Sequence, residues 1–214
     1  MPAEATARVR PGRVSLMRTA IGLMGEQGYE GTSTRDIARA AGVSVAALYY
    51  HFPSKLDLLK QFVQEAHDVV LARLKREIDG SGDDPRAQLD AAVSTIIGSN
   101  LHNEWAQGAA QVAWRELDRL DPKDQRAVSE KRDALIALIR EVIERGSSQG
   151  VFATNGSAEV AEAILRLCMS TIDTNRQSGH TLDDTIALYQ RFAVALADTP
   201  MPHAPSRRAR SRAR

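Results

Sequence analysis

The sequence has few residues of the kinds that build disulfide-linked, metal-stabilised or strand-rich folds. Its 214 residues include one cysteine, Cys168, which excludes an internal disulfide and a cysteine-rich zinc site. The expected role of Cys168 is that of a small buried apolar side chain, with redox sensing as the alternative. Aromatic residues make up 5% of the chain, and no segment of useful length alternates in the manner of a strand. The absence of a strand pattern favours an all-α protein.

Long apolar runs are also missing. No run approaches the ~18 residues that suggest a membrane span, and the first residues lack the apolar segment of a secretory signal. We therefore expect a cytoplasmic protein with no membrane partner. The hydrophobic share of 43% is ordinary for a soluble chain with one sizeable core or two small domains.

Motifs of the common enzyme and metal-binding classes do not occur. The five histidines are scattered without HExxH or paired spacing, and there is no glycine-rich phosphate loop. The sequence predicts no catalytic residue, no metal site and no cofactor, and hence a protein that is not an enzyme. His102 and Asn103 could face a pocket, or they could be solvated.

Charged residues, in contrast, are plentiful and unevenly distributed. Residues 1–60 hold 8 lysines and arginines against 5 acidic residues, residues 61–198 hold 15 against 22, and residues 199–214 hold 5 arginines and no acid. Screening over about 8 to 10 Å keeps the acidic middle from cancelling a basic patch nearby. The distribution favours local attraction to phosphates near the two ends of the chain.

A helix-turn-helix is predicted within residues 33–59, STRDIARAAGVSVAALYYHFPSKLDLL. Ser33 and Asp36 form a capping-box pattern, so a helix is expected to begin at Thr34. Gly42 would end that helix, because a left-handed backbone conformation costs least at glycine.

A second short helix is expected after a three-residue link. Ser44 can cap it, and it would run from Val45 to about His51, with Leu48 and Phe52 anchoring it from beneath. A link of this length fits a helix-turn-helix connection. The remaining faces of the second helix would then be available to DNA.

In this segment the sequence resembles the TetR family of bacterial transcriptional regulators. The family pattern Thr-x-x-Ile-Ala-x-x-Ala-Gly-Val-Ser-x-x-x-Leu-Tyr-x-x-Phe-x-x-Lys is met by Thr34, Ile37, Ala38, Ala41, Gly42, Val43, Ser44, Leu48, Tyr49, Phe52 and Lys55. The resemblance implies an all-α chain of about nine helices, with an N-terminal three-helix DNA-binding domain and a C-terminal helical ligand-binding and dimerisation domain.

Four segments are expected on this basis. They are a flexible arm at 1–12, the helix-turn-helix DNA-binding domain at 13–58, a helical effector-binding and dimerisation domain at 59–198, and a disordered basic tail at 199–214. Arg8, Arg10 and Arg13 could contact DNA phosphates, or the arm could be solvated. The tail could add non-specific nucleic-acid affinity or serve only for solubility.

Apolar stripes predict the helices that flank the second helix of the motif. A supporting helix should run from Arg13 to a break at Gly28, with its buried side formed by Val14, Met17, Ala20, Ile21 and Met24. A long helix should follow from Lys55 to Ile78, with its core side formed by Leu56, Leu59, Phe62, Val63, Ala66, Val70 and Leu74. Because the long helix leaves the DNA-binding domain and enters the body, it can carry movement between them.

The last two helices are expected at 157–177 and 182–197. Their apolar residues do not fall on single stripes, which indicates burial on two sides. The family resemblance implies that this pair and its symmetry mate form a four-helix bundle, so we predict a homodimer through these helices. Packing within one subunit is the alternative.

The family resemblance implies DNA contacts position by position. Thr34 and Arg35 would contact phosphates, and Arg35 could also reach a base. Tyr49 and His51 would hold the DNA backbone, and Lys55 would meet a phosphate at a helix amino end. The alternatives are a half-buried core position for Tyr49 and a solvated one for Lys55.

The second helix of the motif, which would enter the DNA groove and is called the reading helix below, begins with an unusual apolar sequence. Family members commonly carry a Lys-Gly-Thr type sequence where this chain has Val45, Ala46 and Ala47, directly after Ser44 at the DNA-facing amino end. These three side chains can make only apolar contacts, such as with thymine methyl groups. Tyr50 is the first choice for a groove contact, and specificity would depend on Arg35, Tyr50, the terminal arm and DNA shape.

Residues 103–120 and 131–152 resemble a subgroup of TetR regulators that respond to acyl-CoA, fatty-acid or steroid-derived ligands, although 173–181 lack the aromatic residues usual there. The predicted effector pocket has an apolar wall and one anion partner. These candidates are Val93, Ile97, Trp105, Val112, Trp114 and Cys168 for the wall, and Arg115 for the anion. Ordinary core positions, and pairing of Arg115 with a neighbouring acid, are the alternatives.

The sequence therefore predicts a sequence-specific homodimeric repressor that binds double-stranded operator DNA. A small hydrophobic or acyl-CoA-type effector, such as a fatty acid or its thioester, would release it. A non-specific architectural DNA-binding protein and a TetR-like activator are the alternatives.

Overall fold

The computed structural model describes residues 12–174 and 180–200, and these form nine α-helices and one short 3₁₀ helix, with no strand. The helices are α1 (Arg13–Gly31), α2 (Thr34–Ala40), α3 (Val45–His51), α4 (Lys55–Gly80), α5 (Pro85–Leu101), α6 (Glu104–Arg115), the 3₁₀ helix η1 (Leu117–Arg119), α7 (Pro122–Ser148), α8 (Ser157–Thr174) and α9 (Leu182–Ala197). The all-α prediction is confirmed. The predicted arm and tail lie almost entirely outside the described residues, as does the predicted end of the penultimate helix at Gln177.

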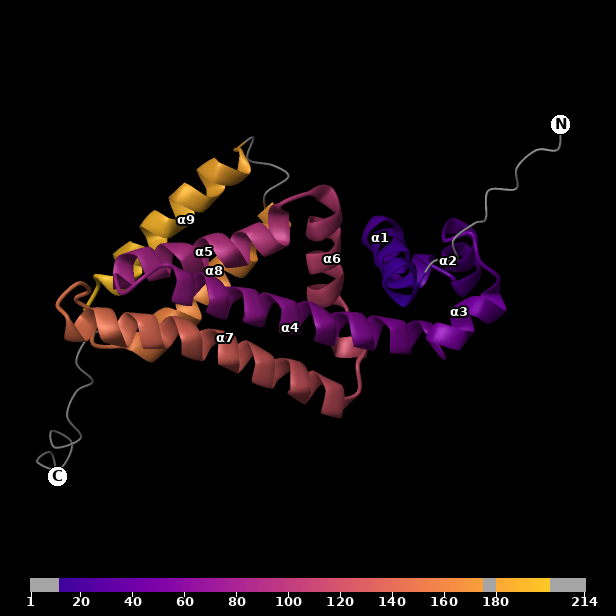
Figure 1. Cartoon of the computed structure of the whole chain (residues 1–214), viewed down its shortest axis with the longest axis horizontal. Helices are drawn as coiled ribbons and strands as arrows, with labels where there is room; N and C mark the ends of the chain where they lie inside the picture. The colour runs from indigo at the N-terminus through magenta and orange to yellow at the C-terminus, as the bar shows by residue number, and fades with distance from the viewer. Residues whose placement is uncertain (1–11, 175–179, 201–214) are drawn as a thin grey trace, which may run out of the picture.

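The helices form a small head and a larger body that are joined by α4 (Figure 1). Helices α1, α2 and α3 gather at one end of the molecule, on the right of Figure 1. Helix α4 runs from this head into the body, where it packs against α5 and α7, and α5 in turn packs against α8 and α9. Helix α6 stands beside α1, so the head contacts the body through α6 as well as through α4.

Serine caps fix where the short helices of the head begin. The Ser33 hydroxyl accepts a hydrogen bond from the backbone N–H of Asp36 at 3.1 Å, and the Asp36 carboxylate accepts one from the Ser33 N–H at 3.2 Å. Ser44 caps α3 by accepting from the N–H of Ala47 at 3.1 Å, and Ser54 caps α4 in the same way. These local bonds satisfy backbone donors that have no partner inside the helix, so the predicted starts at Thr34, Val45 and Lys55 are confirmed.

Two glycines with positive φ shape the head. Gly42, at φ +68°, makes the turn between α2 and α3. Gly28, at φ +78° and ψ 162°, breaks the helical path of α1 at the predicted position, and one further turn then runs to Gly31.

The hydrophobic interior divides into two clusters. The head cluster contains Leu16, Met17, Ala20, Ile21, Met24, Tyr29, Ile37, Ala38, Leu48, Phe52, Leu58, Leu59, Phe62 and Val63, together with Ala109, Val112, Leu120 and Val128 from the body. The body cluster takes residues of α4 from Leu74 onward and residues of α5, α7, α8 and α9. The proposed boundary between residues 58 and 59 thus falls inside α4 and within one packed cluster.

Two residues of the predicted apolar stripes are in fact exposed. Val14 is 74% exposed and Leu56 is 41% exposed, whereas Leu16 and Leu58 are each 1% exposed and occupy the core. Each helix carries apolar residues on both sides of its predicted stripe, so periodicity leaves its rotation open by about one residue, or 100°. The neighbouring helices decide that rotation. In addition, none of the described helices is long and apolar enough to cross a membrane.

Alanine substitutions at two helical glycines of the body should change the stability of the protein in opposite directions. A Cβ atom on Gly146 would overlap the Phe152 ring and lie 3.0 Å from Cβ of Pro85, whereas a Cβ on Gly98 would meet nothing within 4 Å. Gly146→Ala should lower the free energy of unfolding by about 1–3 kcal/mol through overpacking. Gly98→Ala should raise it by about 0.5–1 kcal/mol, because alanine loses less backbone entropy in a helix. Urea titration of both variants checks the pair, and equal shifts would contradict the packing at Gly146.

Candidate DNA-reading face and effector cavity

The outer surface of α2 and α3 presents the predicted DNA-contacting residues. Tyr50 is 86% exposed and Tyr49 is 45% exposed, while Leu48 between them and the core is buried. Arg35 and Ala46 are exposed as well. Because Leu48 is buried on one side of α3, the opposite side of this short helix faces solvent, as a helix that enters a DNA groove requires.

Polar and ring contacts order this face. The hydroxyl groups of Thr34 and Tyr49 lie 3.4 Å apart and join the start of α2 to α3. The Tyr50 and His51 rings meet edge to face with their centroids 5.2 Å apart. Thr34 and Tyr49 thus present two hydroxyl groups side by side, a suitable arrangement for contacting phosphate oxygens.

The four residues at the amino end of the reading helix differ in their accessibility. The Ser44 hydroxyl is engaged as the cap of α3. Val45 packs partly against the head cluster, and Ala47 is half-buried. Ala46 is the exposed member of the apolar triplet, so it is the one best placed to meet a thymine methyl group.

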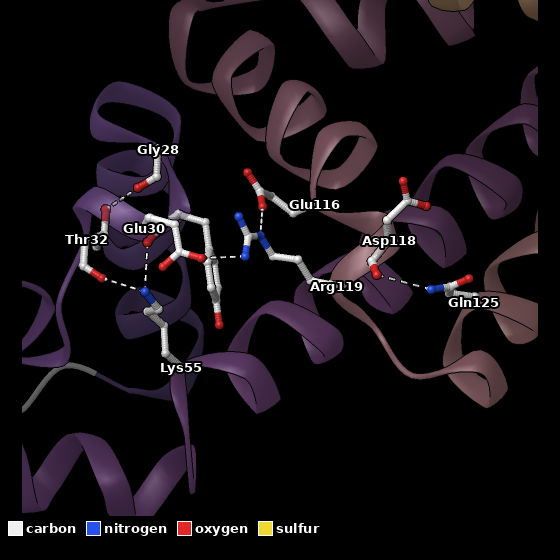
Figure 2. Close-up of polar contacts among 9 residues, drawn as sticks. Gly28, Glu30, Thr32, Lys55, Glu116, Asp118, Arg119 and Gln125 are labelled. Carbon is white, nitrogen blue, oxygen red and sulfur yellow. Dashed lines mark hydrogen bonds and ion pairs between the residues drawn. The ribbon is translucent and has the colours of Figure 1, made fainter.

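Lys55 has a structural role in addition to its predicted DNA contact. Its ammonium donates to the backbone carbonyl oxygens of Tyr29 at 2.8 Å and Thr32 at 3.0 Å, and it lies 3.9 Å from the centroid of the Tyr29 ring (Figure 2). The start of α4 is thereby tied to the end of α1. The phosphate contact of Lys55 remains a prediction.

Arg13 is bound to α4. Its guanidinium pairs with the Glu65 carboxylate at 2.7 Å, bonds to the Gln61 amide oxygen and lies 5.5 Å from the centroid of the Phe52 ring. Of the three arginines proposed for phosphate contact near the N-terminus, Arg8 and Arg10 lie outside the described residues.

A cavity of about 420 Å³ lies between head and body. Residues from six helices line it. Three of these residues, Val14, Met17 and Arg18, belong to α1 of the head. The volume is in the range of small-molecule sites. An occupant would therefore contact both the head, which carries the predicted reading helix, and the body.

The cavity wall is largely apolar, with a tryptophan from each end of α6. Four alanines of α6 form one side, namely Ala106, Ala109, Ala110 and Ala113. The Arg18 guanidinium lies 4.3 Å from the centroid of the Trp105 ring, and the indole N–H of Trp105 donates to the Arg18 carbonyl oxygen at 3.1 Å. Arg132 lies 4.9 Å from the Trp114 ring in the same way. These stacked arginines are held in place at the cavity.

The charged groups of the lining are mainly cationic. Arg18, Arg73 and Arg132 line the cavity, and the acidic group among the lining residues, Glu65, is paired with an arginine of α1. His67 adds a neutral ring, because burial lowers its pKa. Its Nδ1 lies 2.8 Å from the carbonyl oxygen of residue 63, which can only accept, so Nδ1 carries the proton. The cavity favours an apolar ligand that bears a negative charge.

Two of the seven predicted pocket residues line the cavity. Trp105 and Trp114 do so, whereas Arg115 lies on the exposed end of α6 and is not part of the wall. The other four are buried in the two hydrophobic clusters and do not line it, namely Val93, Ile97, Val112 and Cys168. The side of each helix that carries these four residues faces other helices, so they and Arg115 do not line this cavity, and their contact with a ligand stays a prediction.

The structure separates His102 and Asn103, the two residues that could face a pocket. His102 lines the cavity, while the Asn103 amide oxygen instead caps α6 by accepting from the N–H of Ala106 at 2.9 Å. Arg73, Asn100, Arg132 and Met169 were missed. Nothing local marks them, because α4, α5, α7 and α8 bring them together. Among the described residues, no group of histidine, cysteine and acidic side chains could hold a metal ion.

Comparison with known families agrees with this geometry. A family model described as bacterial regulatory proteins of the tetR family matches residues 16–62, and one described as a Tetracyclin repressor-like C-terminal domain matches residues 82–196. The chain belongs to the TetR family of bacterial transcriptional regulators. The predicted resemblance is therefore confirmed for both parts of the chain.

Relatives of this TetR-family protein are similar along nearly their whole length. The HTH-type transcriptional repressor KstR2 of Rhodococcus jostii is 30% identical over 204 residues, which cover 94% of this chain and 98% of the relative. A tetR-family regulator from Rhodococcus RHA1 has a similar crystal structure, with a TM-score of 0.76, 24% identity, and coverage of 87% and 97%. The structure of AibR in complex with isovaleryl coenzyme A and operator DNA gives a TM-score of 0.73 at 19% identity, with coverage of 87% and 98%.

In this TetR-family protein, the thiol of Cys168 should be unreactive toward thiol reagents. Its side chain is 1% exposed, and burial raises the pKa of the thiol to about 12. Because the thiolate is the reactive species, an aromatic disulfide reagent at pH 8 should label native protein very slowly and urea-unfolded protein at once. A Cys168→Ser variant carrying Glu141→Cys, at an exposed site, provides the accessible control. Rapid labelling of the native wild type would contradict this burial and revive redox sensing.

Proposed function

We propose that this TetR-family protein is a homodimeric, sequence-specific repressor that an acyl coenzyme A thioester releases from its operator. The observation that carries the proposal is the cavity between head and body. It combines an apolar wall, three arginines and part of the DNA-binding head itself.

The head supports sequence-specific binding to DNA. Its reading helix exposes Tyr50 and Ala46 for the major groove, and the paired hydroxyls of Thr34 and Tyr49 are placed for the backbone. Phosphate contacts set the register of such a helix, and groove contacts select the sequence. The apolar centre of the helix means that selection would favour thymine methyl groups and DNA shape.

The cavity supports a coenzyme A thioester as the effector. Its apolar wall suits an acyl chain, and its arginines suit phosphate oxygens. Val69, 66% exposed, and Trp114, 41% exposed, form part of the rim, where the nucleotide portion would emerge. A protein with a similar fold, AibR, has been crystallised with isovaleryl coenzyme A and operator DNA.

The position of the cavity explains how an effector would lower DNA affinity. An occupant would press on Val14 and Arg18 of α1 as well as on α6, so filling the cavity would turn the head relative to the body. In a dimer both heads must enter major grooves about one helical turn apart, so a small rotation lowers affinity.

The last two helices support a dimer. Phe192 of α9 is 44% exposed and meets Tyr189 edge to face at 5.8 Å, so an aromatic pair lies at the surface of this helix. Exposed aromatic residues are enriched at subunit interfaces, and TetR-type bundles would bury this face against its symmetry mate.

Selection from a randomised duplex pool tests the DNA-binding part of the proposal. We expect enrichment of one pseudo-palindrome, bound by two subunits as measured by sedimentation velocity. Tyr50→Ala should weaken binding to that duplex by about tenfold, since a specific groove contact is worth about 1–3 kcal/mol, and Tyr50→Phe should retain most of it. If salt titration shows equal affinity for selected and scrambled duplexes, the protein is the alternative, a non-specific architectural DNA-binding protein.

Displacement by isovaleryl coenzyme A tests the effector part. The thioester should release the wild type from the selected duplex, and Arg132→Met should raise the concentration needed by about tenfold, because a charge-assisted bond contributes about 1.5–3 kcal/mol. Arg140→Met, on the outer surface of the same helix α7, is the matched control and should behave as the wild type. Equal responses of all three proteins would place the ligand elsewhere, and an increase in DNA affinity on adding the thioester would indicate an activator.

A further inference from the structure

Arg119 connects the effector body to the DNA-binding head. It is the last residue of η1, the short turn after α6, and its Nη1 pairs with the Glu30 carboxylate at the end of α1 at 2.5 Å (Figure 2). Its Nε donates to Glu116 at the end of α6, so the guanidinium is held by one acid on each side of the junction. A planar guanidinium with two partners fixes direction as well as distance.

The same guanidinium contacts the residue that Lys55 holds. Its central carbon lies 4.8 Å from the centroid of the Tyr29 ring, and the Lys55 ammonium lies 3.9 Å from that centroid. Tyr29 is only 9% exposed, and burial raises the pKa of its hydroxyl, so the ring stays neutral between the two cations. Arg119 of the body thereby reaches the start of α4, directly after the reading helix.

The contact between α1 and α6 links movement at the cavity to movement at Arg119. A Cβ atom on Gly25 of α1 would lie only 3.1 Å from Cα of Gly108, so the two helices touch backbone to backbone. Trp105 with Arg18 lies on one side of this contact and Arg119 with Glu30 lies on the other, and the cavity extends along α6 from Trp105 to Trp114. A displacement of α6 at the cavity must therefore also move the Arg119 end against α1.

We infer that Arg119 is a positioning residue that sets the orientation of the DNA-reading head and transmits effector binding to it. This inference rests on the proposed function. The Arg119 and Glu30 side chains are 39% and 73% exposed, and such ion pairs contribute little to the free energy of folding. The effect of Arg119 should consequently appear in the coupling between effector and DNA, with little change in stability.

Charge reversal separates positioning from simple stabilisation. The quantity measured is the ratio of the dissociation constants for the selected duplex with and without isovaleryl coenzyme A. Arg119→Ala and Arg119→Glu should each lower this ratio by about fivefold or more, a typical coupling magnitude. The double variant Arg119→Glu with Glu30→Arg should recover part of it, because the exchange restores the ion pair between residues 30 and 119 but not the bond to Glu116. Arg140→Ala, which removes an exposed ion pair with Glu144 on α7, should leave the ratio unchanged.

A ratio that stays at the wild-type value in Arg119→Ala, even with a lower thermal midpoint, overturns the inference and makes Arg119 merely structural. If the wild type itself does not respond to the thioester, the proposed effector fails, and a ligand-free measurement then decides on Arg119. Spin labels at Ala40→Cys in the head and Glu141→Cys in the body, in a Cys168→Ser background diluted with unlabelled protein, report the head orientation. Arg119→Ala should broaden the distance distribution, and charge reversal of the pair should narrow it again. An unchanged distribution would refute positioning by Arg119.

Discussion

The close contact between α1 and α6 is the constraint on which the rest of the molecule depends. Gly25 and Gly108 let the two backbones touch, and around them the head cluster recruits Ala109 and Val112 from α6. A three-helix head of this size has little interior of its own, and small domains bury a smaller share of their surface than large ones. Because residues of the body complete the core of the head, the head cannot move independently of the body. Any movement of α6 therefore displaces side chains that form part of the hydrophobic core of the head.

Helix α6 also forms a side of the cavity, and this double use links ligand and DNA. Its small side chains leave room for an occupant, while Trp105 and Trp114 mark the two ends of that room with an arginine against each ring. Two discrete arrangements of a packed helix are easier to reach than a continuous deformation, because close-packed interiors resist gradual change. The alanine face of α6 is thus suited to a switch between an empty and an occupied state.

The basic residues of the head are largely committed to holding the protein together. Arg13 pairs with Glu65, Lys55 binds two carbonyl oxygens, and Lys60 pairs with the buried Asp124 of α7 at 2.5 Å. The count of lysines and arginines therefore overstates the positive charge that the head offers to DNA. On the reading face itself, Arg35 is exposed beside the aromatic side chains of Tyr49 and Tyr50. In the cavity, Arg73 and Arg132 of the body lie with Arg18 of the head, although residues 61–198 carry a net negative charge.

The sequence was enough to predict where the short helices of the head begin and where the chain turns between them, because capping bonds and glycine turns act within three or four residues. Its dense motif was enough to indicate the family. Ser33 with Asp36, Ser44 and Gly42 needed no distant partner. Helix packing sets which side of each helix is buried, as Val14 and Leu56 show, and which residues form the cavity. It also brought Glu30 to Arg119, which lie 89 positions apart in the sequence. Contacts over such separations depend on how whole helices pack, and helical periodicity fixes only which residues share a face.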